Sequence, residues 1–453
     1  MVNAQQLSLK TLIKMPNVFW GASENEILKL VHHPGSGRIP HGQFSLIDED
    51  QEAVYLIRDR LGLNKLFYCL NAETKTLTVG NYLVELVRET ADKEKVVSVP
   101  AGHYVRIDKT TLEKKLCSYY DISTQTEELK AFDVASFQKK VSQTLTNGFR
   151  FLNESYIDSD YFVCLSGGLD STIILNYAKQ LLSDRVTAVT YSYASRETIR
   201  QLGHVVIDPP PKLLLDKVLS EDLHRAHRLA QMVNVPFMAV LVEKQLDPAQ
   251  LDEVIATGQD WRDFNVHCAW VNFNIARYVR ELFPRRSIIF LTGDLMNEFV
   301  ADYAAVNYKG TVYYPQPRIT KDRLRKFFIY GLDAGDREIG IFHAQKTRII
   351  QPYALVAENY RQVPGDFLND PGAKQKLNAA LLFDKNLLKE VSAKKFRSQV
   401  GGEDGGTLGL FHDAGITENI LKERWVSLLS KTGDTEEQKA FWLKIIHAGR
   451  YRH

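Results

Sequence analysis

The stretch that decides the fold is "YFVCLSGGLDSTIILNYAKQLL", residues 161–182. A mostly apolar run, residues 161–165, stops at a glycine-containing turn, and an amphipathic stretch follows, which is the pattern of a strand, a tight loop and a helix. Two glycines let backbone N–H groups approach a ligand closely, and a helix N-terminus adds unpaired donors and partial positive charge. The sequence therefore predicts a phosphate-binding loop between this strand and this helix.

The side chains of the same loop, "SGGLDST", support the prediction that it binds a nucleotide. Ser166, Ser171 and Thr172 offer hydroxyls, whereas Asp170 would repel a bare phosphate, so its presence implies an intervening cation, most simply Mg²⁺. The alternative is that Asp or Ser merely caps the helix, without any ligand. Because the whole seven-residue string follows a β-like run, we favour the phosphate-binding interpretation over capping. The predicted nucleotide-binding residues are Leu165, Ser166, Gly167, Gly168, Leu169, Asp170, Ser171, Thr172, Tyr191, Ser192 and Gly293.

Length and composition indicate a globular protein of two or three domains. The chain has 453 residues, 44% of them hydrophobic and 25% charged, and a net charge of +2, so nothing favours nucleic acid or a membrane as the main partner. Its four cysteines are scattered without a CxxC pair, which argues against a zinc site or a disulfide framework. No signal-peptide-like or membrane-spanning run is visible, so we expect a cytoplasmic protein.

Two domains are expected along the chain. Residues 1–125 read as β-rich hairpins, because short β-branched and aromatic runs alternate with turn residues. Residues 126–453 form the second domain, in which strands at 161–165, 186–193, 236–242 and 287–293 alternate with helices at 171–182, 221–233 and 268–283. Such alternation predicts an α/β fold with a parallel sheet covered on both faces. From residue 321 on, the chain is expected to be mainly helical.

A second strand end also carries polar residues. "LTGDLMNEFVADY", residues 291–303, places Asp294 just past the strand, and Glu298 and Asp302 four residues apart, on one face if this segment is a helix. Ligands of open α/β sheets bind outside the carboxyl ends of the strands, so this stretch and the glycine loop are expected to share one site. The alternative is that these acids compensate a helix dipole.

These motifs together resemble those of a known family. "SGGLDST" is similar to the pyrophosphatase (PP) loop of the ATP-pyrophosphatase superfamily, and its setting resembles asparagine synthetase and β-lactam synthetase. "HGQFSLIDED" and "YLIRDRLGLNKLFY", residues 41–50 and 55–68, resemble that family's amino-terminal domain. The resemblance runs from about Gly42 to about Tyr353. It implies a PP-loop synthetase domain after a degenerate glutaminase-like domain, with ATP and Mg²⁺ as cofactors.

The departures from the family pattern bear on function. Glutamine-dependent relatives begin with a cysteine nucleophile, whereas this chain begins Met-Val-Asn, so we expect no glutaminase activity and a structural amino-terminal domain. At the second motif the relatives have Glu or Tyr, and this chain has Asp294, which we expect to act as a base. The family's metal-binding Asp is Asn297 here, and the expected metal ligands are Asp170, Asn297 and Glu298.

Two further positions follow from the resemblance. Gln345 or Lys346 lies near the family's usual Glu, which weakens the transfer of a Tyr–Glu pair. Lys395, with Lys394 and Arg397 close by, is the candidate for the lysine that stabilises adenylate breakdown, although each could be an ordinary surface side chain. The expected catalytic residues are therefore Asp294, Glu298 and Lys395.

The resulting interpretation is an ATP-dependent, AMP- and pyrophosphate-forming ligase. It adenylates the carboxylate of a small molecule or peptide and couples it to an amine without glutamine, in specialised metabolite, antibiotic or peptide biosynthesis. Alternatives are an intramolecular cyclase similar to β-lactam synthetase or the lasso-peptide cyclases, a superfamily member performing thiolation or argininosuccinate-like condensation, and a non-catalytic nucleotide-binding protein. A homo-oligomer is compatible with each of these.

Overall fold

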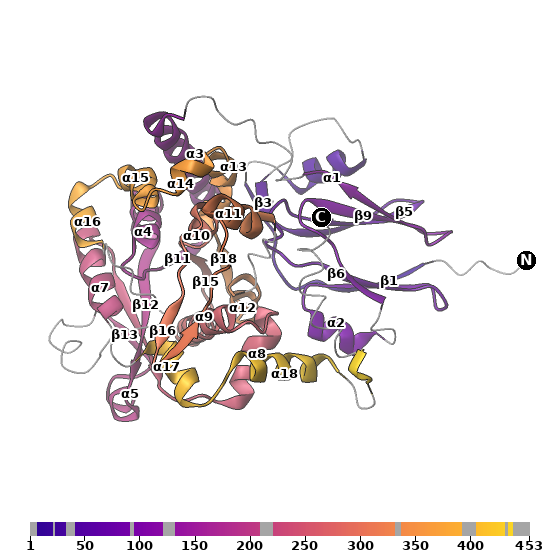
Figure 1. The fold of residues 1–453 in the computed structure, drawn as a ribbon. Helices are drawn as coiled ribbons and strands as arrows, with labels where there is room; N and C mark the ends of the chain where they lie inside the picture. Colours follow the sequence, from indigo (N-terminus) through magenta and orange to yellow (C-terminus); the bar gives the residue numbers. More distant parts are fainter. Residues whose placement is uncertain are drawn as a thin grey trace, which may run out of the picture.

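The computed structural model describes residues 7–20, 23–32, 41–90, 95–120, 132–208, 221–330, 337–391, 405–430 and 434–437. Figure 1 shows a β-rich amino-terminal part beside a larger part in which helices surround a central sheet. Within the described ranges, no helix combines the length and the apolar character that crossing a membrane requires.

The central sheet has six strands in the order β13-β14-β12-β11-β15-β18, and all of its pairs except β13–β14 are parallel. This arrangement confirms the predicted α/β fold with a largely parallel sheet. Two edge strands were not predicted, because each is only three residues long. The strands are β11 (Ser159–Cys164), β12 (Val186–Ala194), β13 (Val205–Ile207), β14 (Phe237–Glu243), β15 (Ser287–Leu291) and β18 (Arg348–Ile350).

Both faces of this sheet are buried. Successive residues of a strand point to opposite faces, so Tyr161 and Val163 pack with α3, α4 and α7, whereas Phe162 packs with α9 and α12. Burial on both faces explains why these strands read as continuous apolar runs. The covering helices are α3 (Val134–Ser155), α4 (Leu169–Leu182), α7 (Glu221–Val233), α9 (Asp263–Leu282) and α12 (Ile339–Ala344).

The remaining elements of this part are short. They include the hairpin β16 (Val306–Tyr308) and β17 (Thr311–Tyr313) and three 3₁₀ turns, η2 (Ser183–Arg185), η3 (Pro352–Val356) and η4 (Ala379–Leu381). The helices are α5 (Arg196–Leu202), α8 (Pro248–Gly258), α10 (Met296–Val300), α11 (Lys321–Tyr330), α13 (Ala357–Arg361), α14 (Gly365–Leu368), α15 (Ala373–Asn378), α16 (Lys385–Glu390), α17 (Gly406–Asp413) and α18 (Glu418–Leu429).

The amino-terminal part is a sandwich of two four-stranded sheets, with the orders β1-β7-β6-β8 and β10-β9-β5-β4. Val54 and Leu56 of one sheet pack against Leu77 and Val79 of the other. Helices α1 (Glu24–His32) and α2 (Leu83–Glu89) cover the two outer faces (Figure 1). The strands are β1 (Ser8–Leu12), β4 (Ser45–Glu49), β5 (Ala53–Arg58), β6 (Phe67–Asn71), β7 (Thr76–Gly80), β8 (Val96–Ser98), β9 (His103–Asp108) and β10 (Lys114–Ser118), and β2 (Val18–Trp20) pairs with β3 (His41–Gln43).

The arginine–aspartate pair of the amino-terminal motif holds this sandwich together. Asp59 is fully buried, and its carboxylate accepts hydrogen bonds from the backbone N–H groups of Phe44, Leu61, Leu63 and Asn64. Arg58 donates to three backbone carbonyls, those of Asn64, Gly62 and Val99. The motif therefore stabilises a turn, since its polar groups form hydrogen bonds with the backbone of neighbouring residues.

The sandwich docks on the β18 edge of the central sheet. The Gln43 amide donates to the Ile349 carbonyl at 3.0 Å and accepts from the Gln351 N–H at 3.0 Å. Helix α18 bridges the two parts as well, since Trp425 and Leu429 pack in one cluster with Leu83 of α2. The described elements change from strands to helices across residues 121–131, and the predicted boundary at 125 remains a prediction.

Candidate active site

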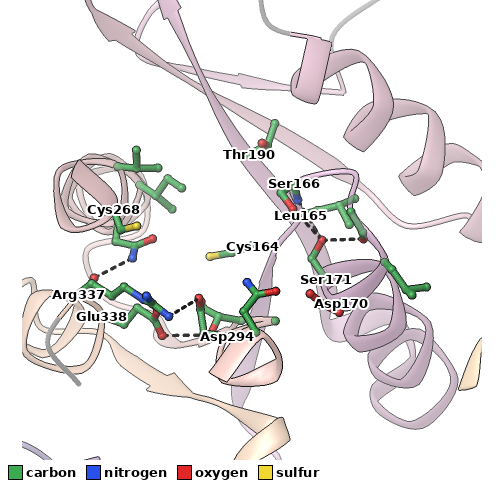
Figure 2. A pocket seen from close by; sticks show the side chains of 18 of the residues that line it. Cys164, Leu165, Ser166, Asp170, Ser171, Thr190, Cys268, Asp294, Arg337 and Glu338 are labelled. Carbon is green, nitrogen blue, oxygen red and sulfur yellow. Dashed lines mark hydrogen bonds and ion pairs between the residues drawn. The ribbon is translucent and has the colours of Figure 1, made fainter. Parts of the chain in front are cut away.

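The carboxyl ends of β11, β12 and β15 open into one cavity of about 240 Å³. Figure 2 shows the glycine loop on one side of it and Asp294, Arg337 and Glu338 on the other, with Cys164 between them. The described lining includes ten of the residues predicted from sequence: Leu165, Ser166, Gly168, Leu169, Asp170, Ser171, Tyr191, Gly293, Asp294 and Asn297. It does not include Gly167, Thr172, Ser192 or Glu298. Lys395, Lys394 and Arg397 lie outside the described residues.

The glycine loop is shaped by its own hydroxyl groups. The Ser171 hydroxyl accepts from the Ser166 N–H and donates to the Gly168 carbonyl, both at 3.2 Å, and Thr172 donates to the same carbonyl at 2.8 Å. No described side chain caps α4, which begins at Leu169, two residues before the predicted start. The backbone N–H groups at the start of α4 are therefore not capped by a described side chain, and such groups can bind an anion.

Two positions of the site require glycine, because neighbouring atoms lie where a Cβ atom would stand. Gly167 has φ +74°, and a Cβ there would lie 2.8 Å from the Cβ of Arg225 on α7. A Cβ on Gly293 would lie 2.8 Å from the Ser171 nitrogen and 3.0 Å from the Asp170 carbonyl carbon. The end of β15 is therefore pressed against the loop, so the two strand ends form one site.

Asp170 is paired with a lysine that the sequence motifs did not indicate. Lys374, on α15, donates to Asp170 Oδ2 at 2.5 Å and to Asn297 Oδ1 at 2.8 Å, and its Nζ lies 3.4 Å from Asp302 Oδ2. Burial lowers the pKa of Lys374, but the Asp170 and Asp302 carboxylates outweigh this effect and raise that pKa above its ordinary value. A charged ammonium group therefore lies against the loop aspartate.

The other oxygen of Asp170 is the point at which a metal fits. Asp170 Oδ1 is buried and has no hydrogen-bond partner in the described part of the chain, which is costly for a carboxylate unless a ligand satisfies it. The rest of the expected ligand set does not fit, because Asn297 is bound to Lys374 and Glu298 to Arg337. The described residues also hold no group of three His, Cys, Asp or Glu able to bind a metal. Glu298 Oε2 is also buried without a hydrogen-bond partner among the described residues, but Glu298 does not line the cavity, so of the expected ligands the residues present fit Mg²⁺ at Asp170.

Glu298 belongs to an ion pair. Its Oε1 accepts from Arg337 Nη2 at 2.6 Å and from the Tyr303 hydroxyl. Burial raises the pKa of the Glu298 carboxyl, but Arg337 and Tyr303 together hold that pKa below its ordinary value. Glu298 and Asp302 do not share a helical face as conditionally predicted, because α10 ends at Val300 and Ala301 is left-handed (φ 51°). Glu298 is therefore a poor proton acceptor.

A pair of carboxyl groups lies opposite the loop. Arg337 holds both, with Nη2 3.5 Å from Asp294 Oδ1 and Nε 3.1 Å from Glu338 Oε1 (Figure 2). Burial and the neighbouring Asp294 raise the pKa of Glu338 well above its ordinary value, although Arg337 opposes them. Like charges in contact cannot both ionise readily, so Glu338 holds its proton more tightly than an ordinary glutamate, beside Asp294 at the wall of the cavity.

The glutamate that the structure places beside Asp294 is Glu338, which the sequence analysis did not single out. Neither Gln345 nor Lys346 lines the described cavity; Gln345 donates to Glu253 at 3.2 Å, and Lys346 faces a separate cavity between the two parts of the chain. The signal that could have found Glu338 is weak, since "DREIG" reads as an ordinary acidic start to a helix. Its role is set by contacts with distant residues.

The amino-terminal part supports this carboxyl pair indirectly. Gln351 donates its side-chain amide to Glu338, while its backbone N–H is bound by Gln43 at 3.0 Å. Thr292, at the end of β15, donates to Glu338 Oε2 at 3.4 Å. A chain of hydrogen bonds thus connects the docked sandwich to Glu338, and the structural role of that domain stays a prediction.

The wall formed by α9 is largely apolar. Phe264, Cys268, Val271, Asn272 and Ile275 recur at helical spacing and line the cavity. Asn272 is fixed by donating to the Arg337 carbonyl at 2.8 Å. Helix α9 starts at Asp263, five residues before the predicted start, and this extra length supplies Phe264.

Comparisons with known proteins agree with the sequence motifs. A model of the asparagine synthase family matches residues 157–389, just over half of the chain. Asparagine synthetase [glutamine-hydrolyzing] 2 of Bacillus subtilis (strain 168) is 23% identical over 322 residues, which are 61% of this chain and 39% of that protein. The chain therefore spans well under two thirds of the length of that relative.

Solved structures give weaker matches. NMN synthetase from Francisella tularensis is 14% identical with a TM-score of 0.28, covering 71% of this chain and 97% of that one. An NH3-dependent NAD synthetase from Campylobacter jejuni subsp. jejuni NCTC 11168 is 12% identical with a TM-score of 0.25, covering 59% and 100%. Such scores carry no conclusion about function.

Proposed function

Because the chain belongs to the asparagine synthase family, we propose that it is an ATP-dependent ligase that adenylates a substrate carboxylate and couples the product to an amine. The observation that carries this proposal is the placement of an uncapped loop–helix N-terminus and the carboxyl pair of Asp294 and Glu338 on opposite sides of one cavity. Phosphate chemistry needs the first, and amine deprotonation needs the second.

In the first half-reaction, an oxygen of the substrate carboxylate attacks the α-phosphorus of ATP. The bond from that phosphorus to the bridging oxygen breaks, and pyrophosphate leaves with the electron pair. The N–H groups at the start of α4 and the Lys374 ammonium group bind its negative charge. A Mg²⁺ ion bound with the triphosphate would take Asp170 Oδ1 as its protein ligand and neutralise phosphate charge.

In the second half-reaction, the amine nitrogen attacks the acyl carbon of the adenylate. AMP leaves with the electrons of the acyl–oxygen bond, and Asp294 takes the proton that the amine loses. Arg337 and Glu338 hold Asp294 in place. We assign Glu298 the positioning of Arg337 rather than base catalysis, because it is buried in an ion pair. The role of Lys395 in breakdown of the adenylate stays a prediction.

We further propose that the amine is supplied without glutamine hydrolysis. The described amino-terminal part contains Cys69, which is buried in the core, and Cys117, which contacts Tyr104 on the neighbouring strand. Cys164 and Cys268 line the ligase cavity, and burial raises the pKa of the Cys164 thiol, with Asp294 and Glu338 adding to this effect. A neutral thiol is a weak nucleophile.

The test is acid-dependent exchange of labelled pyrophosphate into ATP. The protein is given ATP, Mg²⁺ and a panel of free amino acids, dicarboxylic acids and short peptides, with hydroxylamine as a trap for the acyl-adenylate. Exchange and hydroxamate formation with one class of acid support the ligase. A product lighter than the acid by one water, without added amine, assigns an intramolecular cyclase. ATP binding without exchange for any member of the panel contradicts catalysis and favours a nucleotide-binding protein.

A further inference from the structure

The positive charge next to Asp170 of the glycine loop comes from a lysine side chain of the same protein, Lys374. Lys374 Nζ lies within hydrogen-bond distance of Asp170 Oδ2 (2.5 Å) and Asn297 Oδ1 (2.8 Å), and its side chain is only 16% exposed. Asp302 lies 3.4 Å from the same nitrogen. Three oxygens from two separate stretches, the glycine loop and residues 291–303, therefore converge on one ammonium group.

The identity of residue 297 decides what can be bound there. A carboxylate at this position would add a negative charge and a strong ligand for a divalent cation, whereas the Asn297 amide is neutral and a weaker ligand. Asp170 contributes only one oxygen to this point, and that oxygen already accepts from Lys374. A divalent ion could enter only by displacing an ammonium group that two carboxylates hold.

We propose that Lys374 replaces a protein-bound metal ion at Asp170 and Asn297, so that the loop works with one Mg²⁺, carried by the nucleotide at Asp170 Oδ1, and one fixed lysine. This inference rests on the proposed use of ATP. The fixed charge is present in every molecule and screens Asp170 from the phosphates before any ligand arrives. It also ties α15 to the glycine loop, which links the carboxyl-terminal half of the chain to nucleotide binding.

The experiment counts Mn²⁺ ions by the electron paramagnetic resonance signal of free Mn²⁺. Protein is titrated with and without α,β-methylene-ATP, which cannot be cleaved between the α- and β-phosphorus. We expect wild type to bind one Mn²⁺ per bound nucleotide and none without nucleotide. The double variant Asn297→Asp/Lys374→Met, which trades the ammonium group for a carboxylate, should bind one additional Mn²⁺ in both conditions.

A second measurement tests the charge of Lys374 itself. Lys374→Met should weaken binding of inorganic pyrophosphate by about 10- to 100-fold, the usual loss for a charge-assisted hydrogen bond. The matched control is Lys376→Met, two residues along the same helix, whose side chain is 57% exposed and pairs with Asp370 on the surface. The control should bind pyrophosphate as wild type does. Thermal unfolding of each variant establishes that it is folded.

Three outcomes would overturn the inference: wild type binding two Mn²⁺ per nucleotide, a folded double variant gaining none, or a folded Lys374→Met variant binding pyrophosphate as tightly as wild type. Failure of the proposed function would give a different experimental result. If α,β-methylene-ATP does not bind to wild type, the use of ATP is wrong, while the nucleotide-free Mn²⁺ counts on the double variant still decide the role of Lys374.

Discussion

Replacing Asp294 with Asn should separate the two half-reactions. The amide keeps the shape of the side chain and can still accept from Arg337, which lies 3.5 Å away and is held independently by Glu298 at 2.6 Å and Glu338 at 3.1 Å. The site should therefore stay assembled. Under the proposed mechanism, the substitution removes the proton acceptor beside the attacking amine. Loss of a general base typically slows a reaction by ~10²–10⁴-fold, which corresponds to about 3–5 kcal/mol in the barrier.

The assay measures both halves on the same preparation. Exchange of labelled pyrophosphate into ATP reports adenylation and should stay within a few-fold of wild type, while amide formation with a basic amine should fall by the factor above. Hydroxylamine is a weakly basic nucleophile and is mostly unprotonated near neutral pH. Its attack therefore depends less on a general base, and hydroxamate formation should fall much less. Asp370→Asn, a surface carboxylate paired with Lys376, serves as the matched control and should change neither half.

The result that would refute this reasoning is loss of exchange and amide formation together in a folded Asp294→Asn variant. Asp294 would then serve the phosphates or the metal rather than the amine. Equal losses with hydroxylamine and with a basic amine would likewise contradict proton transfer to Asp294, because the loss should follow the basicity of the nucleophile.

Three further predictions concern the supports of the site. Gly293→Ala places a methyl group 2.8 Å from the Ser171 nitrogen, so ATP affinity by calorimetry should fall by about 10-fold or more; unchanged affinity would show that the loop can move aside. Asp59→Ala leaves four buried N–H donors unpaired and should cost about 3 kcal/mol or more in the free energy of unfolding by denaturant titration; a cost below about 1 kcal/mol would contradict it. Because the folded pKa of Glu338 lies above its unfolded value of 4.5, wild type should lose stability as pH rises above about 4.5. Glu338→Gln should lack that loss, and identical pH–stability slopes for the two proteins would refute the protonated state.

The amino-acid sequence alone was sufficient for the features that depend on neighbours along the chain. The loop at residues 166–172 is one: its glycines, its hydroxyls and the start of α4 lie within seven residues, so their geometry follows from local conformational preferences. The strands β11, β12, β14 and β15 were predicted within one or two residues, because burial on both faces leaves a continuous apolar run. Helices α4 and α9 began earlier than predicted, since helix starts without a capping side chain carry little signal.

Only the tertiary structure decided which charges meet. Lys374 reaches Asp170 across 204 positions of sequence, and Glu338, at the start of α12, meets Asp294 across more than 40. Glu298 and Asp294 look equivalent in "GDLMNE", yet one is neutralised by Arg337 and Tyr303 while the other faces the cavity. The physical reason is that an ionisable side chain is controlled by burial and by the charges within a few ångströms, and packing of distant segments sets both. The sequence therefore specified a glycine loop and a parallel sheet, whereas the fold decided which lysine, which carboxyl pair and which ion pair surround that loop.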